Sequence, residues 1–124
     1  MIHLKSFITE FYDVFKVDEV KPPWEIVFIL PDLIRKKIET LDKNRFIIKG
    51  DSAIHKSATI EKGVSFKGPV IIGKDSFIGA NAYLRNGVYI GNESSVGPCC
   101  EIKASIIFNQ TKLAHFNFIG DSLL

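Results

Sequence analysis

The chain has 124 residues, of which 46% are hydrophobic and 24% are charged, and its formal net charge is +2. This composition is that of one ordinary globular domain and argues against intrinsic disorder. The weak positive charge, without a cluster of basic and aromatic residues, argues against nucleic acid as a partner. The longest apolar run, Ile26 to Leu30, is far shorter than the ~20 residues of a spanning helix, so no membrane partner is expected either.

The N-terminus and the cysteines of the chain bear on its compartment and on metal binding. The N-terminus has no charged region followed by an apolar one, so no secretory signal is expected and a cytoplasmic location is predicted. Cys99 and Cys100 are adjacent, which would strain a disulfide between them and leaves a zinc site without further ligands at suitable spacing. No metal site is therefore predicted.

The first fifty residues predict helices. Apolar residues recur at helical spacing at Leu4, Phe7, Ile8, Phe11 and Phe15, which predicts an amphipathic helix over residues 4–20. Lys21-Pro22-Pro23 ends it, because proline cannot donate a backbone hydrogen bond. A second helical segment is predicted from about Trp24 to Leu41, interrupted or restarted at Pro31. The aromatic stripe that includes Trp24 is interpreted as core or interface, and residues 45–49 as a short strand.

A repeat of six residues dominates the rest of the sequence. One apolar residue returns at every sixth position: Ile54, Ile60, Phe66, Ile72, Ile78, Leu84, Ile90, Val96, Ile102, Phe108 and Ala114, with Gly120 in the same frame. Two positions before each of these the side chain is nearly always small or β-branched, as at Ser76, Ser94 and Cys100. Hexapeptide repeats of this kind are typical of a parallel β-helix in which both columns face inward. Cys100 is therefore expected inside and Cys99 outside.

The repeat also predicts geometry. Three hexapeptides make one coil of eighteen residues, so residues eighteen apart should stack at about 4.8 Å. Ile54, Ile72, Ile90 and Phe108 would form one internal ladder, Ile60, Ile78, Val96 and Ala114 a second, and Phe66, Leu84 and Ile102 a third. The predicted fold is mainly β, with a helical cap or linker over residues 1–50 and a single-stranded β-helix of three to four coils over residues 51–124.

The same spacing stacks three cations on the outside. Lys67, Arg85 and Lys103 each follow an inward apolar residue and lie eighteen residues apart. A basic column of this kind would repel itself unless an anion sits among the side chains, and a phosphate group fits the guanidinium fork of Arg and the point charge of Lys. The equally weighted alternative is that these side chains extend into solvent or pair with carboxylates such as Glu101.

His115 is the histidine with the most informative neighbours. With Asn117 and Asp121 close in sequence, it is a candidate for an oriented general base, because imidazole titrates near neutral pH and an amide or carboxylate can fix its tautomer. A metal site is a weaker interpretation, because His3 lies outside the repeat and His55 lies more than three coils away.

Three segments carry a resemblance to a known family: Tyr83-Leu84-Arg85-Asn86-Gly87, Glu101-Ile102-Lys103-Ala104 and residues 115–121, which read His-Phe-Asn-Phe-Ile-Gly-Asp. With the hexapeptide frame, they resemble the left-handed β-helix hexapeptide-repeat transferases, and among these the acetyltransferase half of bifunctional sugar-phosphate nucleotidyltransferases. The resemblance implies a left-handed β-helix packed as a homotrimer. It also implies that Arg85 and Lys103 bind a sugar phosphate, that Asn117 and Phe118 lie at the sugar, and that His115 deprotonates the sugar amine for attack on acetyl-CoA.

The sequence departs from that family at two points. Phe118 stands where the family has a tyrosine that contacts the sugar, and the sequence stops at Leu124, before the coils that bind acetyl-CoA in the family. The leading hypothesis is thus an incomplete acetyltransferase-type domain of amino-sugar nucleotide synthesis, or one associated with a nucleotidyltransferase, with no acetyl-CoA-binding residue assigned. The alternatives are a non-catalytic domain for oligomerisation or regulation, and another hexapeptide acyltransferase that uses a longer acyl donor.

Overall fold

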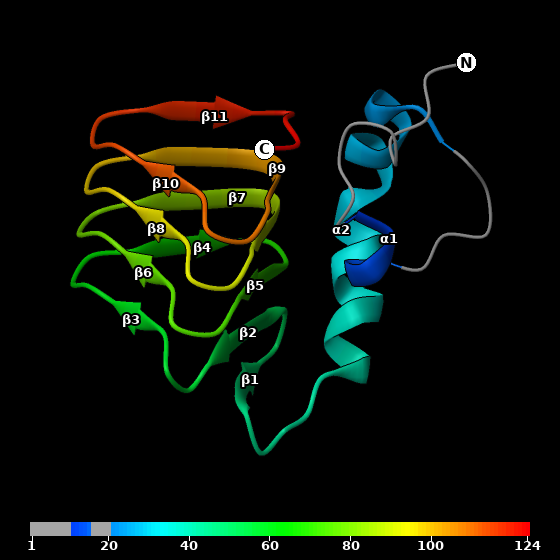
Figure 1. Cartoon of the computed structure of the whole chain (residues 1–124), viewed down its shortest axis with the longest axis horizontal. Helices are drawn as coiled ribbons and strands as arrows, with labels where there is room; N and C mark the ends of the chain where they lie inside the picture. The colour runs from blue at the N-terminus through cyan, green and yellow to red at the C-terminus, as the bar shows by residue number, and fades with distance from the viewer. Residues whose placement is uncertain (1–10, 16–20) are drawn as a thin grey trace.

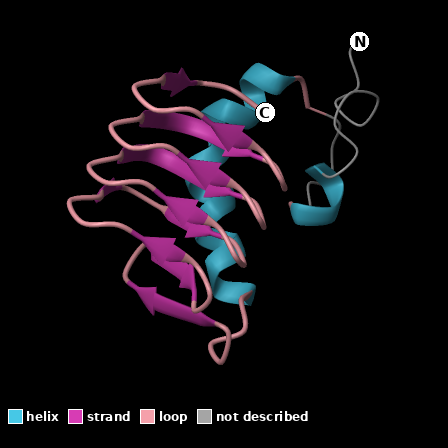
Figure 2. Cartoon of the chain, turned by 60° about the vertical axis from the view of Figure 1, so that its left-hand side comes forward, coloured by secondary structure: helices cyan, strands magenta, loops and turns pink. Residues whose placement is uncertain are grey.

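The computed structural model describes residues 11–15 and 21–124 of the chain. A coiled β-helix forms most of it, and helix α2 runs along one side of the coils (Figures 1 and 2). The helices are α1 (Phe11–Val14) and α2 (Pro23–Thr40). The strands are β1 (Phe46–Lys49), β2 (Ser52–His55), β3 (Thr59–Ile60), β4 (Ser65–Lys67), β5 (Val70–Ile72), β6 (Phe77–Ile78), β7 (Tyr83–Ile90), β8 (Ser95–Val96), β9 (Glu101–Ile107), β10 (Lys112–Leu113) and β11 (Phe118–Gly120).

Helix α2 forms because its apolar residues lie one turn apart. Ile26, Leu30, Ile34 and Ile38 are all buried and face strands β5, β7 and β9. Pro23 occupies the first helical turn, where its missing N–H costs nothing. Within the described residues no helix is both long and apolar enough to span a bilayer.

The interruption expected at Pro31 is wrong, because α2 continues through this residue as one helix. An interior proline removes one helical hydrogen bond. Here its ring packs against the β-helix at Gly87, where an added Cβ would lie 3.2 Å from the nitrogen of Pro31. Burial of the helix on both sides of Pro31 offsets the missing bond, so tertiary packing overrides the local signal.

Only a short part of the first predicted helix falls in the described residues. Phe11 begins α1 and Phe15 follows it directly; both are buried, and the ring centroid of Phe15 lies 5.3 Å from that of Tyr89 on β7. This confirms their predicted packing role. The predicted helical positions Leu4, Phe7 and Ile8 lie outside the described residues.

The parallel β-helix predicted from the repeat is confirmed. Ile54 pairs with Ile72 and Ile72 with Ile90, each eighteen residues apart, and the third ladder likewise pairs Leu84 with Ile102. The strand order is β1-β2-β5-β7-β9-β11 in one sheet, where β4 also pairs with β7, and β10-β8-β6-β3 in the other, and every pair except β1 with β2 is parallel. The predicted strand at residues 45–49 is β1, which pairs with β2 in antiparallel fashion and covers the first coil.

The eighteen-residue spacing fails after Lys103. The turn that follows Arg85 contains two residues, Asn86 and Gly87, whereas the turn after Lys103 contains only Ala104. From this point on, stacked residues lie seventeen apart. Ile90 pairs with Ile107, and Val96 pairs with Leu113. Phe108, Ala114 and Gly120, expected in the inward frame, are therefore wrong assignments.

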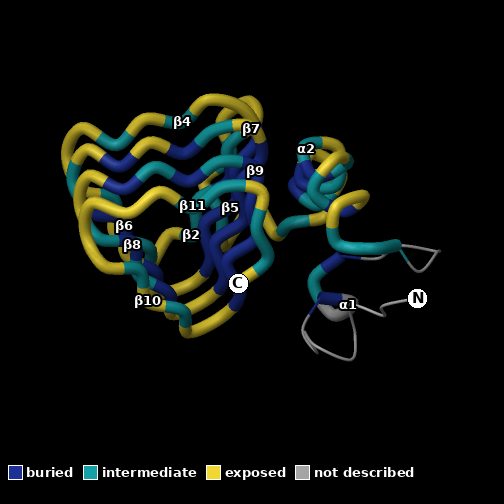
Figure 3. The backbone as a smooth tube through the Cα atoms, turned by 90° about the horizontal axis from the view of Figure 1, so that it is seen from above, coloured by how far each residue is buried: buried dark blue, intermediate teal, exposed yellow. Residues whose placement is uncertain are grey.

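Two apolar clusters result from this architecture, and Figure 3 shows the buried positions as dark segments between α2 and the coils and inside the coils. The inner cluster fills the coils with the ladder residues and with Cys100, while Cys99 is exposed, as predicted. The outer cluster joins α1 and α2 to the face of the β-helix that carries Ile71, Tyr89 and Ile106. Among the described residues, the helices of the predicted cap thus cover a lateral face, and the other two faces remain to carry a site.

Candidate functional site

The predicted basic column lies on a face formed by β4, the first halves of β7 and β9, and β11. We call this the basic face. Lys67 pairs with Arg85, and Arg85 pairs with Lys103, in adjacent parallel strands. The next strand places Gly120 beside Lys103. The side chains of the column therefore project from consecutive rungs at about 4.8 Å spacing, and the rung above Lys103 contributes no side chain to it.

Arg85 is held by a carboxylate from the neighbouring strand. Its Nε donates a hydrogen bond of 2.7 Å to Oε2 of Glu101. The two side chains are 33% and 40% exposed, so this pair contributes no more than about 1 kcal/mol to stability. Because a guanidinium has five N–H donors, the pair orients Arg85 and leaves further donors for an anion. The alternative in which Glu101 pairs with the column is thus realised at Arg85.

The other two cations of the column differ from Arg85. Nζ of Lys103 lies 3.5 Å from Oδ1 of Asp121, a long contact between partly exposed groups. Lys67 is exposed, and no ion pair forms to it in the part of the chain that the structure describes. The basic face thus has two loosely engaged ammonium groups on either side of one oriented guanidinium.

His115 lies in the turn that precedes β11, at the edge of the basic face opposite the cations. Its side chain is exposed and its ring centroid lies 5.2 Å from that of Phe116. Strand β11, about 10 Å long at 3.3 Å per residue, separates this turn from the turn that contains Asp121. His115 and the cations thus lie on one face, at its two edges.

The groups expected to orient His115 make other contacts. The Nδ2 of Asn117 donates to the carbonyl of Ala114 at 2.9 Å, and Asp121 pairs with Lys103. Among the described residues neither forms a hydrogen bond with the imidazole. The role of His115 as a general base stays a prediction, and so does sugar binding by Asn117.

Aromatic side chains occupy the surface between the two edges. Tyr83, Glu101 and Phe118 pair across β7, β9 and β11 and form a second outward column beside the cations. Tyr83 is 39% exposed and Phe118 is 59% exposed. The basic face therefore presents two aromatic surfaces between an imidazole and a row of cations, an arrangement that suits a small, polar, anionic ring compound.

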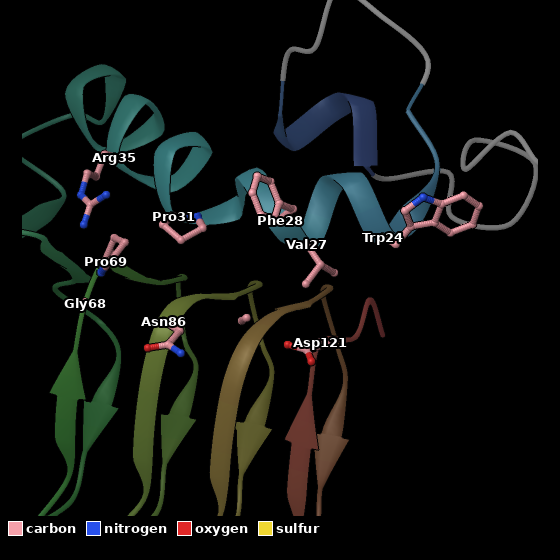
Figure 4. A pocket seen from close by; sticks show the side chains of 10 residues that line it. Trp24, Val27, Phe28, Pro31, Arg35, Gly68, Pro69, Asn86 and Asp121 are labelled. Atoms are coloured by element: carbon pink, nitrogen blue, oxygen red, sulfur yellow. The ribbon is translucent and has the colours of Figure 1, made fainter.

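A cleft of about 690 Å³ lies between α2 and the turns of the β-helix and borders the basic face at Asp121 (Figure 4). Its lining residues on α2 are Trp24, Val27, Phe28, Pro31 and Arg35, and those on the turns are Gly68, Pro69, Asn86, Ala104 and Asp121. We call it the α2 groove. Trp24 is 68% exposed and Phe28 is 87% exposed. Trp24 therefore does not belong to the core of this chain, which leaves the interface part of its interpretation.

The sequence contained a signal for this groove, in the helical segment that precedes the more prominent hexapeptide repeat. Trp24 and Phe28 lie one turn apart, but on a different stripe of the helix from Ile26 and Leu30. Two large aromatic residues off the buried stripe indicate an exposed apolar surface.

Comparison with known proteins shows which proteins have a similar repeat. The family model described as "Bacterial transferase hexapeptide (six repeats)" matches residues 51–86 and 69–104. The bifunctional protein GlmU of Clostridium acetobutylicum is 40% identical over 72 residues, which cover 58% of this chain and 15% of that protein. GlmU of Methanocaldococcus jannaschii is 33% identical over 110 residues, which cover 86% of this chain and 27% of that protein.

A third relative has a more explicit name. The bifunctional sugar-1-phosphate nucleotidylyltransferase/acetyltransferase of Sulfurisphaera tokodaii is 32% identical over 110 residues, which cover 86% of this chain and 27% of that protein. The chain thus spans between 15% and 27% of the length of these three relatives.

Proposed function

Because the β-helical region of this chain belongs to the bacterial transferase hexapeptide-repeat family, we propose that the chain is a sugar-phosphate N-acetyltransferase-type domain whose acceptor binds on the basic face. The observation that carries the proposal is the placement of Arg85 and Lys103 on adjacent rungs, in register, with His115 at the opposite edge. The names of the relatives support acetyl transfer and a sugar 1-phosphate as the class of substrate.

The proposed roles follow from the chemistry of each group. Arg85, oriented by Glu101, and Lys103 bind the phosphate through charge-assisted hydrogen bonds. Tyr83 and Phe118 pack against the sugar ring. The imidazole of His115 accepts a proton from the sugar amine, whose nitrogen attacks the thioester carbonyl of acetyl-CoA. The C–N bond forms as the C–S bond breaks, and coenzyme A leaves as a thiolate that takes the proton from the imidazolium of His115. None of the described residues is assigned to acetyl-CoA.

A homotrimer is part of this proposal. Helix α2 covers only one lateral face of the β-helix, and the other two carry partly exposed aromatic residues, Phe77 on one and Tyr83 and Phe118 on the other. Packing of such faces between copies would bury apolar surface and would bring further residues to the basic face. The mass in solution, measured by sedimentation equilibrium, tests this part.

The test of the acceptor site uses matched variants. Glucosamine 1-phosphate binding is measured by titration calorimetry for Arg85→Ala and for Arg45→Ala, which removes an arginine paired with Asp42 outside the basic face. We expect Arg85→Ala to weaken binding by tenfold or more, the loss of a hydrogen bond to a charged group, and Arg45→Ala to leave it unchanged. Equal affinities in the two variants would contradict the proposed site.

The test of catalysis measures release of the coenzyme A thiol from acetyl-CoA. We expect His115→Asn to lose at least a hundredfold in rate, the usual contribution of a general base. His55→Asn is the control, because His55 lies on β2 and its Nδ1 already contacts the hydroxyl of Ser57 at 2.8 Å.

One alternative function has its own support. His115 has no orienting hydrogen bond among the described residues, and Phe118 lacks a hydroxyl. Both observations favour a hexapeptide domain that binds or assembles without catalysis. Stable oligomers without thiol release, and without a shift of the melting temperature on addition of glucosamine 1-phosphate, would support this alternative.

A further inference from the structure

The α2 groove is an elongated surface with two different ends. Arg35 lies with Gly68 and Pro69 at one end, and Trp24 lies near Asp121 at the other (Figure 4). Arg35 lies eleven positions after Trp24 in the helix, a rise of about 16 Å at 1.5 Å per residue. The opposite wall consists of turns from four successive coils, about 14 Å at 4.8 Å per coil. The two walls therefore match in length, and the groove runs parallel to the helix.

A projecting side chain lies directly beside the groove. Phe28 is 87% exposed and lies in the N-terminal third of α2, where it lines the groove with Val27 and Pro31. A single exposed aromatic residue is unremarkable, but an aromatic pair beside an apolar cleft of this size is a typical feature of a protein interface. Hence the same surface has an aromatic side chain that projects from it and a cleft into which such a side chain can insert.

Two copies of the groove can be paired through a two-fold axis. If two α2 helices pack side by side in opposite directions, residues equally distant from the midpoint of the contact face each other. With the midpoint between Phe28 and Pro31, Phe28 of one copy faces Pro31 of the other, and Trp24 faces Arg35. The antiparallel direction also opposes the two helix dipoles favourably.

The pairing of Trp24 with Arg35 is chemically favourable. A guanidinium over an indole ring is a cation–π contact worth about 0.5–2 kcal/mol. Among the described residues, Arg35 pairs with Asp32 and Asp51 through exposed contacts of 3.4–3.5 Å. These use the N–H edges of the guanidinium, so its flat face is available for stacking. Two such contacts arise by symmetry.

From these observations we propose that the α2 groove binds a second copy of this chain through a two-fold axis, with each Phe28 inserted into the groove of its partner. This interface does not depend on the proposed acetyl transfer, although the groove borders the basic face at Asp121, which pairs with Lys103. If the chain also forms trimers through its other faces, the α2 contact joins one trimer to another.

The chain contains a built-in reporter, because Trp24 is its sole tryptophan. We expect the emission of the full chain to shift to shorter wavelength as protein concentration rises, together with a doubling of mass by sedimentation equilibrium. Phe28→Asp should raise the dissociation constant about 30-fold or more, the effect of losing an interface hot spot. Because Phe28 is exposed, this variant should keep its fold, which circular dichroism verifies.

Two further variants complete the test. Arg35→Met keeps an unbranched stem but removes the cation, and should weaken association about tenfold through the two symmetric contacts. Ile47→Asp is the control, since Ile47 is 50% exposed on β1, outside the groove, and it should leave association unchanged. A mass that Phe28→Asp does not alter would overturn the proposal. So would a blue-shifted emission that depends neither on concentration nor on Phe28, because the occupant would then come from the same chain.

Discussion

Gly97 is the position where the packing of the coils can be tested most directly. A Cβ added at this residue would lie 2.7 Å from the backbone nitrogen of His115 and 2.8 Å from the carbonyl carbon of Ala114. Backbone atoms of the next coil cannot rotate away, so Gly97→Ala must push the rung that carries His115. Overpacking of this kind costs about 1–3 kcal/mol. For a domain of this size, each kcal/mol lowers the melting temperature by about 4 °C.

The matched control is Gly120→Ala. Its added Cβ would also lie 2.7 Å from another atom, but that atom belongs to the ring of Phe118, which is 59% exposed and can move. Thermal unfolding at one protein concentration should therefore show a fall of about 4–12 °C for Gly97→Ala and little change for Gly120→Ala. If Gly97→Ala melts at or above the wild-type temperature, the coils are not packed as closely at this corner as described. Gly97→Ala should also slow release of the coenzyme A thiol if His115 is the base.

Two further measurements test the interior. Ile90→Ala should lower the free energy of unfolding by about 2–5 kcal/mol, because Ile90 is fully buried between two ladder neighbours. Ile47→Ala, at an exposed site, should lower it by less than about 0.5 kcal/mol. Equal losses for the two variants in urea titrations would argue against the inner ladder. In native protein, Cys99 should react with a thiol reagent at once and Cys100 only at the rate of unfolding. Rapid reaction of two thiols per chain would contradict the inward position of Cys100.

Most of the β-helix was predictable because its period is carried by many residues at once. Residues such as Ile72, Ile78 and Ile90 recur at a fixed interval, and each also pairs with a chemically similar residue one coil away. A pattern repeated at this density leaves few alternative folds that bury the same side chains. The expectation for Cys99 and Cys100 followed from the same frame.

The shortened turn at Ala104 was not predictable from the period. The three residues Ile106, Ile107 and Phe108 are all apolar, so the sequence does not alternate there and either of two frames would bury a large side chain. In the structure, both sides of the chain are buried at the end of β9. Ile107 faces into the coils, and Ile106 and Phe108 face the outer cluster with α2. A strand that is buried on both faces carries no sequence signal for its register.

The ion pairs of the site depended on details that spacing does not contain. The Arg85 contact to Glu101 is diagonal between neighbouring strands, and the Lys103 contact to Asp121 spans a turn whose length was not known. The sequence therefore indicated which residues share the face, and the structure was needed to show which of the cations are already engaged.

The lost turn residue changes the site itself. With eighteen-residue spacing, Asp121 would stack directly above Lys103 and close the basic column with a carboxylate. With seventeen, Gly120 takes that place, and Asp121 moves into the turn, where it reaches Lys103 from the side at 3.5 Å. Gly120 itself bears no side chain, and the ring of Phe118 covers it, 2.7 Å from where a Cβ would lie. An anion that bridges Arg85 and Lys103 would meet the ring of Phe118 above Gly120 instead of a carboxylate stacked on the column, so the irregularity in the repeat favours the proposed phosphate site.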